Sequence, residues 1–229
     1  DTVINVPQQY DMDLKADLVY RPVLRTWLPE LKPFDSIKLS SVLTPNDFTI
    51  AAYLPRIING STRIDSGVVK VYEVGDTLRY AASLKRLTQD QYAIWYPSLR
   101  GSLRKDSIYA RVRLGDSLNK EQFALGGAIN HDLGSDSGLT YIRMYRGIIL
   151  DYDRWEVNSQ NRLVFGPAGF YIRDFAMNKD NQSIEVNSQR PEFNAPFTVN
   201  IRNFLLSNDT RMISRDRLVA DGYLNAKPE

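Results

Sequence analysis

The sequence contains no cysteine among its 229 residues, so neither a disulfide bond nor a thiolate metal site can form. Positive and negative side chains nearly cancel, to a formal net charge of +2. Proteins that grip phosphate backbones need clustered Lys and Arg, so we expect no nucleic-acid partner. No run approaches the roughly 18 apolar residues of a membrane-spanning helix, and no signal peptide is recognisable. We therefore expect the chain to be a segment of a longer protein whose targeting sequence lies elsewhere.

Apolar side chains instead recur at every second position in several segments, which is typical of half-buried β-strands. The alternation is clearest in residues 78–85, 106–114, 142–150 and 197–202. The residues that we place on the apolar side of these strands are Leu78, Tyr80, Leu84, Ile108, Val112, Leu114, Ile142, Met144, Phe197, Val199 and Ile201. Few helical segments are present to cover that side. The sheet is therefore expected either to fold on itself as a closed sandwich or to curl into a trough with an open apolar floor.

Residues 148–189 predict an antiparallel meander of four short strands separated by turn residues. The second strand is 163–165, the third 170–177 and the fourth 183–187. Asn, Asp and Gly tolerate the left-handed backbone conformations of tight turns, and they lie between these segments.

One helix is expected, near residues 21–32. Pro22 suits a first helical turn, and apolar residues follow at helical spacing, whereas Pro29 is expected to kink or split the helix. We interpret it as a short amphipathic helix that caps a core, with the plugging or flanking of a sheet as the functional alternative.

The order of strands and turns in 148–189 resembles the repeat of the TamB/AsmA-like family, the translocation and assembly module proteins of bacterial envelopes. A strand ending in Trp155 is followed by Asn161, a short apolar strand, a Gly turn and an aliphatic-aromatic strand. An Asn/Asp turn and the segment Ile184-x-Val186 complete the pattern, which continues through 193–229. The resemblance is clearest over 106–229 and contains no catalytic signature.

This resemblance implies an elongated, curled antiparallel β-sheet groove (a β-taco) in a periplasmic protein anchored at the inner membrane. It implies a role in phospholipid transport between the inner and outer membranes and in outer-membrane protein assembly. The implied partners are phospholipid acyl chains and an outer-membrane barrel protein of the BamA/TamA type. On this interpretation the eleven alternating apolar residues named above line the groove. Residues 1–229 then form one groove segment, with a secondary boundary between 33 and 47, after the helix.

Two other classes of protein remain as alternatives. A closed β-sandwich of an adhesin or a coat protein would use the same alternation to fill a private core. A hydrolase would need His131, the one histidine, which occurs in a polar loop at 130–138 beside Ser and Asp residues. Adjacent residues in a loop do not supply triad geometry, and no nucleophile motif accompanies them. We therefore expect no enzymatic activity and no cofactor.

Clustered carboxylates are the remaining candidates for a metal site. The loop 130–138 spaces its carboxylates loosely, without the regular pattern and distal Glu of a calcium-binding loop. Asp11-x-Asp13 and Asp151-x-Asp153 each place two carboxylates on one face of a strand. We interpret all of them as surface residues and expect no metal site.

Overall fold

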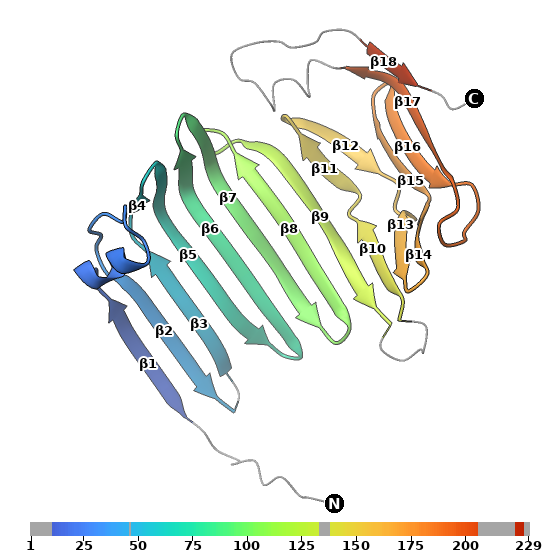
Figure 1. The fold of residues 1–229 in the computed structure, drawn as a ribbon. Helices are drawn as coiled ribbons and strands as arrows, with labels where there is room; N and C mark the ends of the chain where they lie inside the picture. The colour runs from blue at the N-terminus through green and yellow to red at the C-terminus, as the bar shows by residue number, and fades with distance from the viewer. Residues whose placement is uncertain (1–10, 46, 133–137, 206–222, 227–229) are drawn as a thin grey trace, which may run out of the picture. The chain divides into compact units, whose positions relative to one another are not determined.

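The computed structural model describes residues 11–45, 47–132, 138–205 and 223–226. The fold is all-β with antiparallel strand pairing and one short 3-10 helix, which confirms the fold class expected from the sequence (Figure 1). In the described residues the strands are β1 (Met12–Leu18), β2 (Ile37–Thr44), β3 (Asp47–Leu54), β4 (Ile57–Asn59), β5 (Thr62–Val74), β6 (Thr77–Gln89), β7 (Tyr92–Arg104), β8 (Ser107–Gly115), β9 (Glu121–His131), β10 (Thr140–Met144), β11 (Gly147–Leu150), β12 (Asp153–Val157), β13 (Arg162–Gly166), β14 (Gly169–Arg173), β15 (Phe175–Lys179), β16 (Gln182–Ser188), β17 (Phe197–Leu205) and β18 (Tyr223–Ala226).

The predicted helix is a 3-10 helix, η1, that spans only Pro22–Thr26. Pro22 begins it, as expected, and a single further turn closes when Leu28 N–H donates to the Leu24 carbonyl at 3.0 Å. Pro29 cannot donate the next helical hydrogen bond, which accounts for the short length. No residue of η1 is buried, so the expected apolar capping stripe is absent from it. Within the described residues, no helical segment has the length and apolarity that crossing a membrane requires.

The chain divides into two compact units. Unit 1 comprises residues 1–104 and 114–119, and unit 2 comprises residues 105–113 and 120–229. The prediction that residues 1–229 form one groove segment, with a secondary boundary between 33 and 47, stays a prediction.

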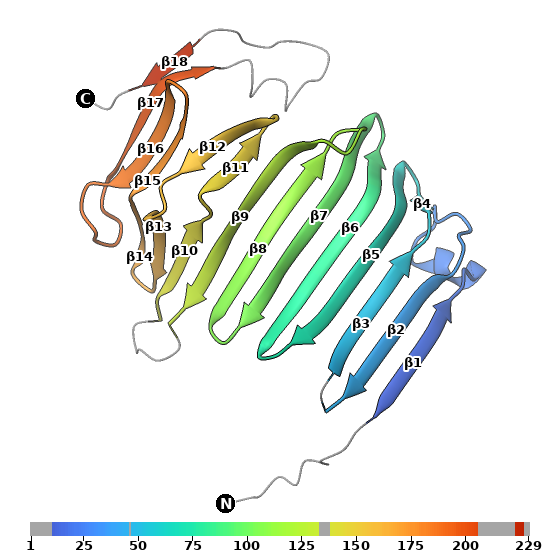
Figure 2. The same cartoon turned by 180° about the vertical axis from the view of Figure 1, so that it is seen from behind.

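In unit 1, strands β1, β2, β3, β5, β6 and β7 follow one another in the sheet, each antiparallel to the next. Strand β4 lies end to end with β3, and both pair with the long strand β5. The same order is visible from behind in Figure 2.

A crease interrupts this sheet along one line. We define the crease as the residues Pro55–Arg56, Asp65–Ser66, Lys85–Arg86 and Trp95–Pro97. The register of β5 on β6 omits Ser66 and Lys85, and the register of β6 on β7 omits Tyr96 and Pro97. Pro55 and Pro97 have no N–H to give the ladder, and Ser66 and Tyr96 have positive φ values of 35° and 46°. Ladder hydrogen bonds are therefore lost at this line while the register on either side is preserved.

Unit 2 contains short strands placed end to end. Strands β10 and β11 both pair with β9, and β13 and β12 then pair with β10 and β11 respectively. Strand β14 pairs with β13, and β15 with β12, and the order continues through β16, β17 and β18. The predictions of single strands over 142–150 and 170–177 are therefore wrong. The chain leaves the strand at Tyr145–Arg146 and at Asp174, whose φ is 56°. Residues 148–189 consequently contribute to six strands rather than four.

Polar side chains replace the ladder hydrogen bonds at these breaks. The Asn161 amide accepts from the Met144 N–H at 2.8 Å and donates to the Met144 carbonyl at 3.0 Å. It also donates to the Asn158 carbonyl at 2.6 Å. At the second break, the Phe175 N–H donates to Asn187 Oδ1 at 3.2 Å. Asn161 is 2% exposed, so its amide takes the place of a peptide group inside the sheet.

The core of unit 2 is a cluster of five buried side chains. Its members are Ile148, Trp155, Val157, Met177 and Phe204. The rings of Trp155 on β12 and Phe204 on β17 lie with centroids 5.8 Å apart. Strands β15 and β16 separate β12 from β17 in the sheet, so this contact requires the sheet to curl until its apolar side chains meet.

Candidate functional site: an apolar sheet face and a charged cluster

One face of the unit 1 sheet is apolar from β1 to β7. The register joins Ala16, Leu39, Ala52, Val69, Ala82 and Leu99 in one row across six strands. The neighbouring row on this face contains Leu14, Ser41, Ile50, Val71, Tyr80 and Gly101. Leu78 and Leu84 extend the face to either side of these rows. We call this surface the apolar face. Three predicted groove residues, Leu78, Tyr80 and Leu84, therefore share it.

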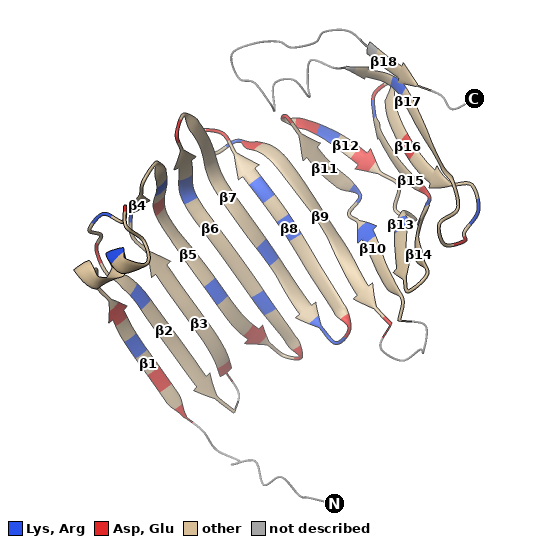
Figure 3. Ribbon diagram, viewed as in Figure 1, with Lys and Arg blue, Asp and Glu red and all other residues tan. Residues whose placement is uncertain are grey.

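Much of the apolar face is open to solvent. The side chains of Leu14, Ile50, Val69 and Leu99 are between 38% and 51% exposed. The rows between them belong to the opposite face and contain mostly polar residues, for example Lys15, Ser40, Lys70 and Arg100. Figure 3 shows that charged residues occupy isolated positions along these strands, as alternation requires. Contiguous exposed apolar surface is typical of surfaces that bind a protein partner, a membrane or an apolar ligand.

The other predicted groove residues have mixed surroundings. Met144 and Ile201 pack against the buried cluster of unit 2. Val199 pairs with Val186 on the same side of the sheet as Ile201, and Phe197, at the beginning of β17, is exposed. Ile108 and Val112 on β8 are exposed, whereas Leu114 and Ile142 are half-buried. The eleven residues therefore do not share one environment, and their role in lining a groove stays a prediction.

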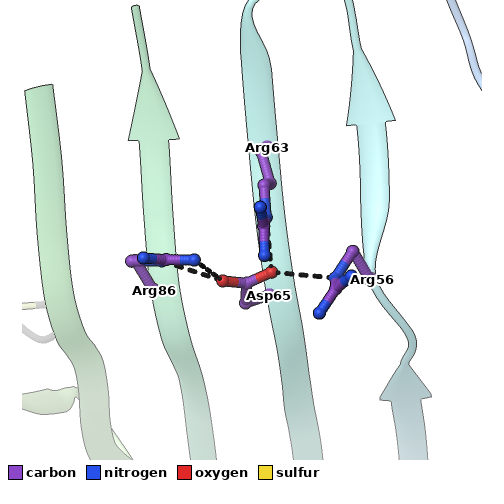
Figure 4. Close-up of polar contacts among 4 residues, drawn as sticks. All are labelled: Arg56, Arg63, Asp65 and Arg86. Carbon is purple, nitrogen blue, oxygen red and sulfur yellow. Dashed lines mark hydrogen bonds and ion pairs between the residues drawn. The ribbon is translucent and has the colours of Figure 1, made fainter. Parts of the chain in front are cut away.

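A cluster of charged residues lies at the crease. Asp65 on β5 accepts from Arg56 Nε at 3.2 Å and from Arg63 Nε at 2.7 Å through Oδ1. Its Oδ2 accepts from Arg86 on β6, at 2.8 Å from Nε and 2.6 Å from Nη2. Figure 4 shows the three guanidinium groups around the carboxylate. We call these four residues the arginine cluster.

The electrostatics of the arginine cluster favour the ionised carboxylate. Asp65 is 9% exposed, and burial by itself would raise its pKa. The hydrogen bonds from Arg63 and Arg86, together with their positive charge, outweigh burial and lower the pKa of Asp65 below its ordinary value. The carboxylate therefore stays ionised at neutral pH and fixes the arginines in place.

The arginine cluster borders a surface hollow of about 340 Å³, which Ser66, Lys85 and Trp95 also line. Trp95 is the cross-strand neighbour of Arg86, and the Arg86 Cζ atom lies 4.7 Å from the centroid of the Trp95 ring. This stacking orients the guanidinium group of Arg86.

No sequence motif marks the arginine cluster, because its members come from separate parts of the chain. The signal present in the sequence is indirect: Pro55 and Pro97 indicate where the ladder fails, and Asp65 lies at a position that alternation assigns to the same side as Arg63. Strand register, which the sequence does not specify, brings Arg86 opposite Asp65.

The remaining sequence candidates have ordinary surroundings. His131 Nδ1 lies 2.8 Å from Thr140 Oγ1, its cross-strand partner, and the side chain is exposed. The triad and calcium alternatives both depend on residues 133–137 of the polar loop, which lie outside the described residues. Asp13 pairs with Lys15, Asp151 accepts from Gln122, and Asp153 pairs with Lys179. Among the residues that the structure describes, no group of three or more His, Asp or Glu side chains could hold a metal ion.

Comparison of the chain with protein-family models, with curated proteins and with solved structures gave no match. The fold, the two surfaces described above and the resemblance noted in the sequence are therefore the basis for proposing a function.

Proposed function

We propose that this chain is a hydrophobic-groove segment of a TamB-like protein that supports phospholipid transport between the inner and outer membranes. The observation that carries the proposal is the apolar face of unit 1, which crosses six strands and leaves much of its side-chain surface exposed. Its occupants on this proposal are phospholipid acyl chains.

An open apolar face would lower the free-energy barrier to moving a lipid through water. Each CH2 group exposed to water costs roughly 0.8 kcal/mol, so a two-chain lipid in water faces a barrier of tens of kcal/mol. A face of Val, Leu, Ile and Ala side chains removes most of that cost. The apolar face has few polar groups that could bind one particular lipid, so it would hold no single lipid tightly.

The proposed cellular setting follows from the family resemblance. We place the chain in the periplasm, as part of an envelope protein anchored at the inner membrane. A contribution to outer-membrane protein assembly, with a BamA/TamA-like barrel as the partner, belongs to the same proposal.

Photo-crosslinking from neighbouring residues tests the proposal. A photoreactive amino acid is incorporated at Val69, on the apolar face, or at Lys70, which points to the opposite face. In cells with radiolabelled phospholipid, we expect lipid adducts from position 69 and none from position 70. A third variant at Val112 tests an exposed apolar position of unit 2. Equal labelling at positions 69 and 70, or none at either, would contradict lipid transport on this face.

One observation favours a second candidate, a closed structural module. In unit 2 the apolar side chains pack on one another, and Trp155 is 1% exposed. A module whose apolar side chains pack within its own core needs no lipid. On this candidate the chain serves as an adhesion or coat element. This candidate predicts that adducts are absent from both units, whereas the lipid proposal predicts them at least on unit 1.

A further inference from the structure

We propose that the hollow at the crease of unit 1 binds the phosphate group of a small ligand, held by Arg56, Arg63 and Arg86 with Lys85 at the rim. This inference goes beyond the proposed function, because it concerns a charged site and stands whether or not the apolar face carries lipid.

The charge of the hollow is the first observation. Four cationic side chains and one carboxylate line it, which leaves a net charge of +3. The half-buried Arg63 and Arg86 and the exposed Arg56 all share the single carboxylate of Asp65. An excess of this size in a concave site attracts an anion.

The arrangement of donors is the second observation. Arg56 and Arg63 reach Asp65 through Nε, and Arg86 through Nε and Nη2. A guanidinium group is a rigid fork of five N–H donors that matches phosphate oxygens. Asp65 therefore acts as a template that gathers three such forks before any ligand arrives. Preorganisation of this kind reduces the entropy lost on binding.

The gradient of exposure indicates how a ligand would enter. The side chains of Arg56, Arg63 and Arg86 are 64%, 36% and 26% exposed, so the hollow opens on the Arg56 side and is closed by Arg86. Trp95 stacks on Arg86 and contributes an indole ring to the wall. The ring would accommodate a carbon group attached to the phosphate.

A phosphate group fits this site better than a carboxylate. Its charge of −1 to −2 offsets part of the net charge of +3, and its several oxygens can accept from more than one guanidinium group at a time. Two sources supply this chemistry: a free phosphate or phosphate ester, and the headgroup of a phospholipid. The headgroup alternative rests on the proposed function, whereas the free phosphate does not.

Side-chain NMR of the arginine Nε–H groups in the full chain measures this binding directly. Inorganic phosphate is titrated at constant ionic strength, with chloride as the comparison anion. We expect saturable shifts of the Arg63 and Arg86 signals with phosphate and none with chloride. Arg56→Gln removes one charged donor and should weaken binding about tenfold, since a hydrogen bond to a charged group contributes roughly one such factor.

Arg79→Gln is the matched control, because Arg79 is an exposed arginine of β6 that does not line the hollow. We expect it to leave the phosphate titration unchanged. Circular dichroism establishes that each variant is folded, and Lys85→Gln, at an exposed position on the rim, replaces Arg56→Gln if that variant unfolds. Shifts that follow ionic strength alone, or that are equal in Arg56→Gln and the unaltered chain, would overturn the proposal.

A second titration separates the two sources of phosphate. Glycerol phosphate is compared with dihexanoyl phosphatidylglycerol below its micellar concentration. Equal affinities assign the site to small phosphates, and tighter binding of the lipid that Arg56→Gln weakens assigns it to a headgroup. Lipid binding that Arg56→Gln leaves unchanged, with no binding of either phosphate, means that only the tails are recognised and overturns the phosphate site. Failure of phosphate binding leaves the crosslinking result at position 69 to decide the lipid proposal separately.

Discussion

The two units use the same alternation of apolar and polar residues but place their apolar side chains in opposite environments. In unit 1, Leu14 and Val69 lie on a face that is substantially exposed, whereas in unit 2 Trp155 and Met177 lie in a closed cluster. Strand length distinguishes them. Strands β5, β6 and β7 have 13 residues each, and strands β10–β15 have four or five.

Short strands placed end to end give a sheet freedom to curl. Each break at Tyr145–Arg146 or Asp174 relaxes the ladder, and Asn161 and Asn187 supply hydrogen bonds that the backbone no longer makes. The curl then brings Trp155 onto Phe204. Alternation therefore indicates which side of a strand is apolar, whereas in unit 2 that side closes where several short strands and their breaks occur together.

The largest effect is expected from Trp155→Ala. Trp155 is almost fully buried against Phe204, and removing such a side chain costs about 3–5 kcal/mol of unfolding free energy. Chemical denaturation gives the total, and hydrogen exchange assigns the loss to unit 2. A loss below about 1 kcal/mol would mean that the closed cluster does not hold unit 2 together.

Asn161→Ala should have the next largest effect. The substitution leaves the part-buried Met144 N–H and carbonyl without the Asn161 side chain, which costs about 1–3 kcal/mol in total. Hydrogen exchange should increase most at the end of β10. Asn200→Ala, at a half-buried position of β17, is the matched control and should change stability much less.

The arginine cluster predicts that the stability of unit 1 depends on pH. The folded pKa of Asp65 is lowered, so its contribution to stability is complete above the unfolded value of about 4 and is lost as the pH falls through the folded pKa. Denaturation followed by hydrogen exchange between pH 6 and pH 2 should show this decline. Asp65→Asn should remove it, and an unchanged pH profile in that variant would contradict the assignment.

The smallest effect on stability is expected from Leu14→Ala. Leu14 is 51% exposed on the apolar face, so its truncation should change the unfolding free energy by about 0.5 kcal/mol or less. It should instead reduce the binding of an apolar fluorescent dye. A loss as large as that of Trp155→Ala would show that unit 1 is closed in solution.

The sequence predicts the side of each strand better than the strand ends. Leu78, Tyr80 and Leu84 share a face because a period of two follows directly from backbone geometry. The break at Asp174 is not predicted, although Asp favours turns, because the nearby Tyr171, Ile172 and Phe175 are strand formers. Pro29 is expected to kink or split the helix at 21–32. The helix instead ends at Thr26, before Pro29, so it is shorter than expected.

The arginine cluster was beyond prediction for a different reason. Asp65 and Arg86 meet because β5 and β6 pair in one register, and a shift by one residue would place them on opposite faces. Hairpin register depends on turn geometry, which a single sequence specifies poorly. A contact between two strands therefore follows from their register in the folded sheet and not from the spacing of residues in the sequence.

The crease also limits the length of the apolar face along the strands. Between Leu78 and Leu84 the apolar face extends for six residue steps along β6, or about 20 Å, and beyond Leu84 the ladder is interrupted by charged residues. One leaflet of a bilayer has a hydrocarbon depth of about 15 Å, half of the full core. On the proposed function the crease would act as a molecular ruler: tails up to that span would gain contact with every added carbon, and longer tails would gain nothing more.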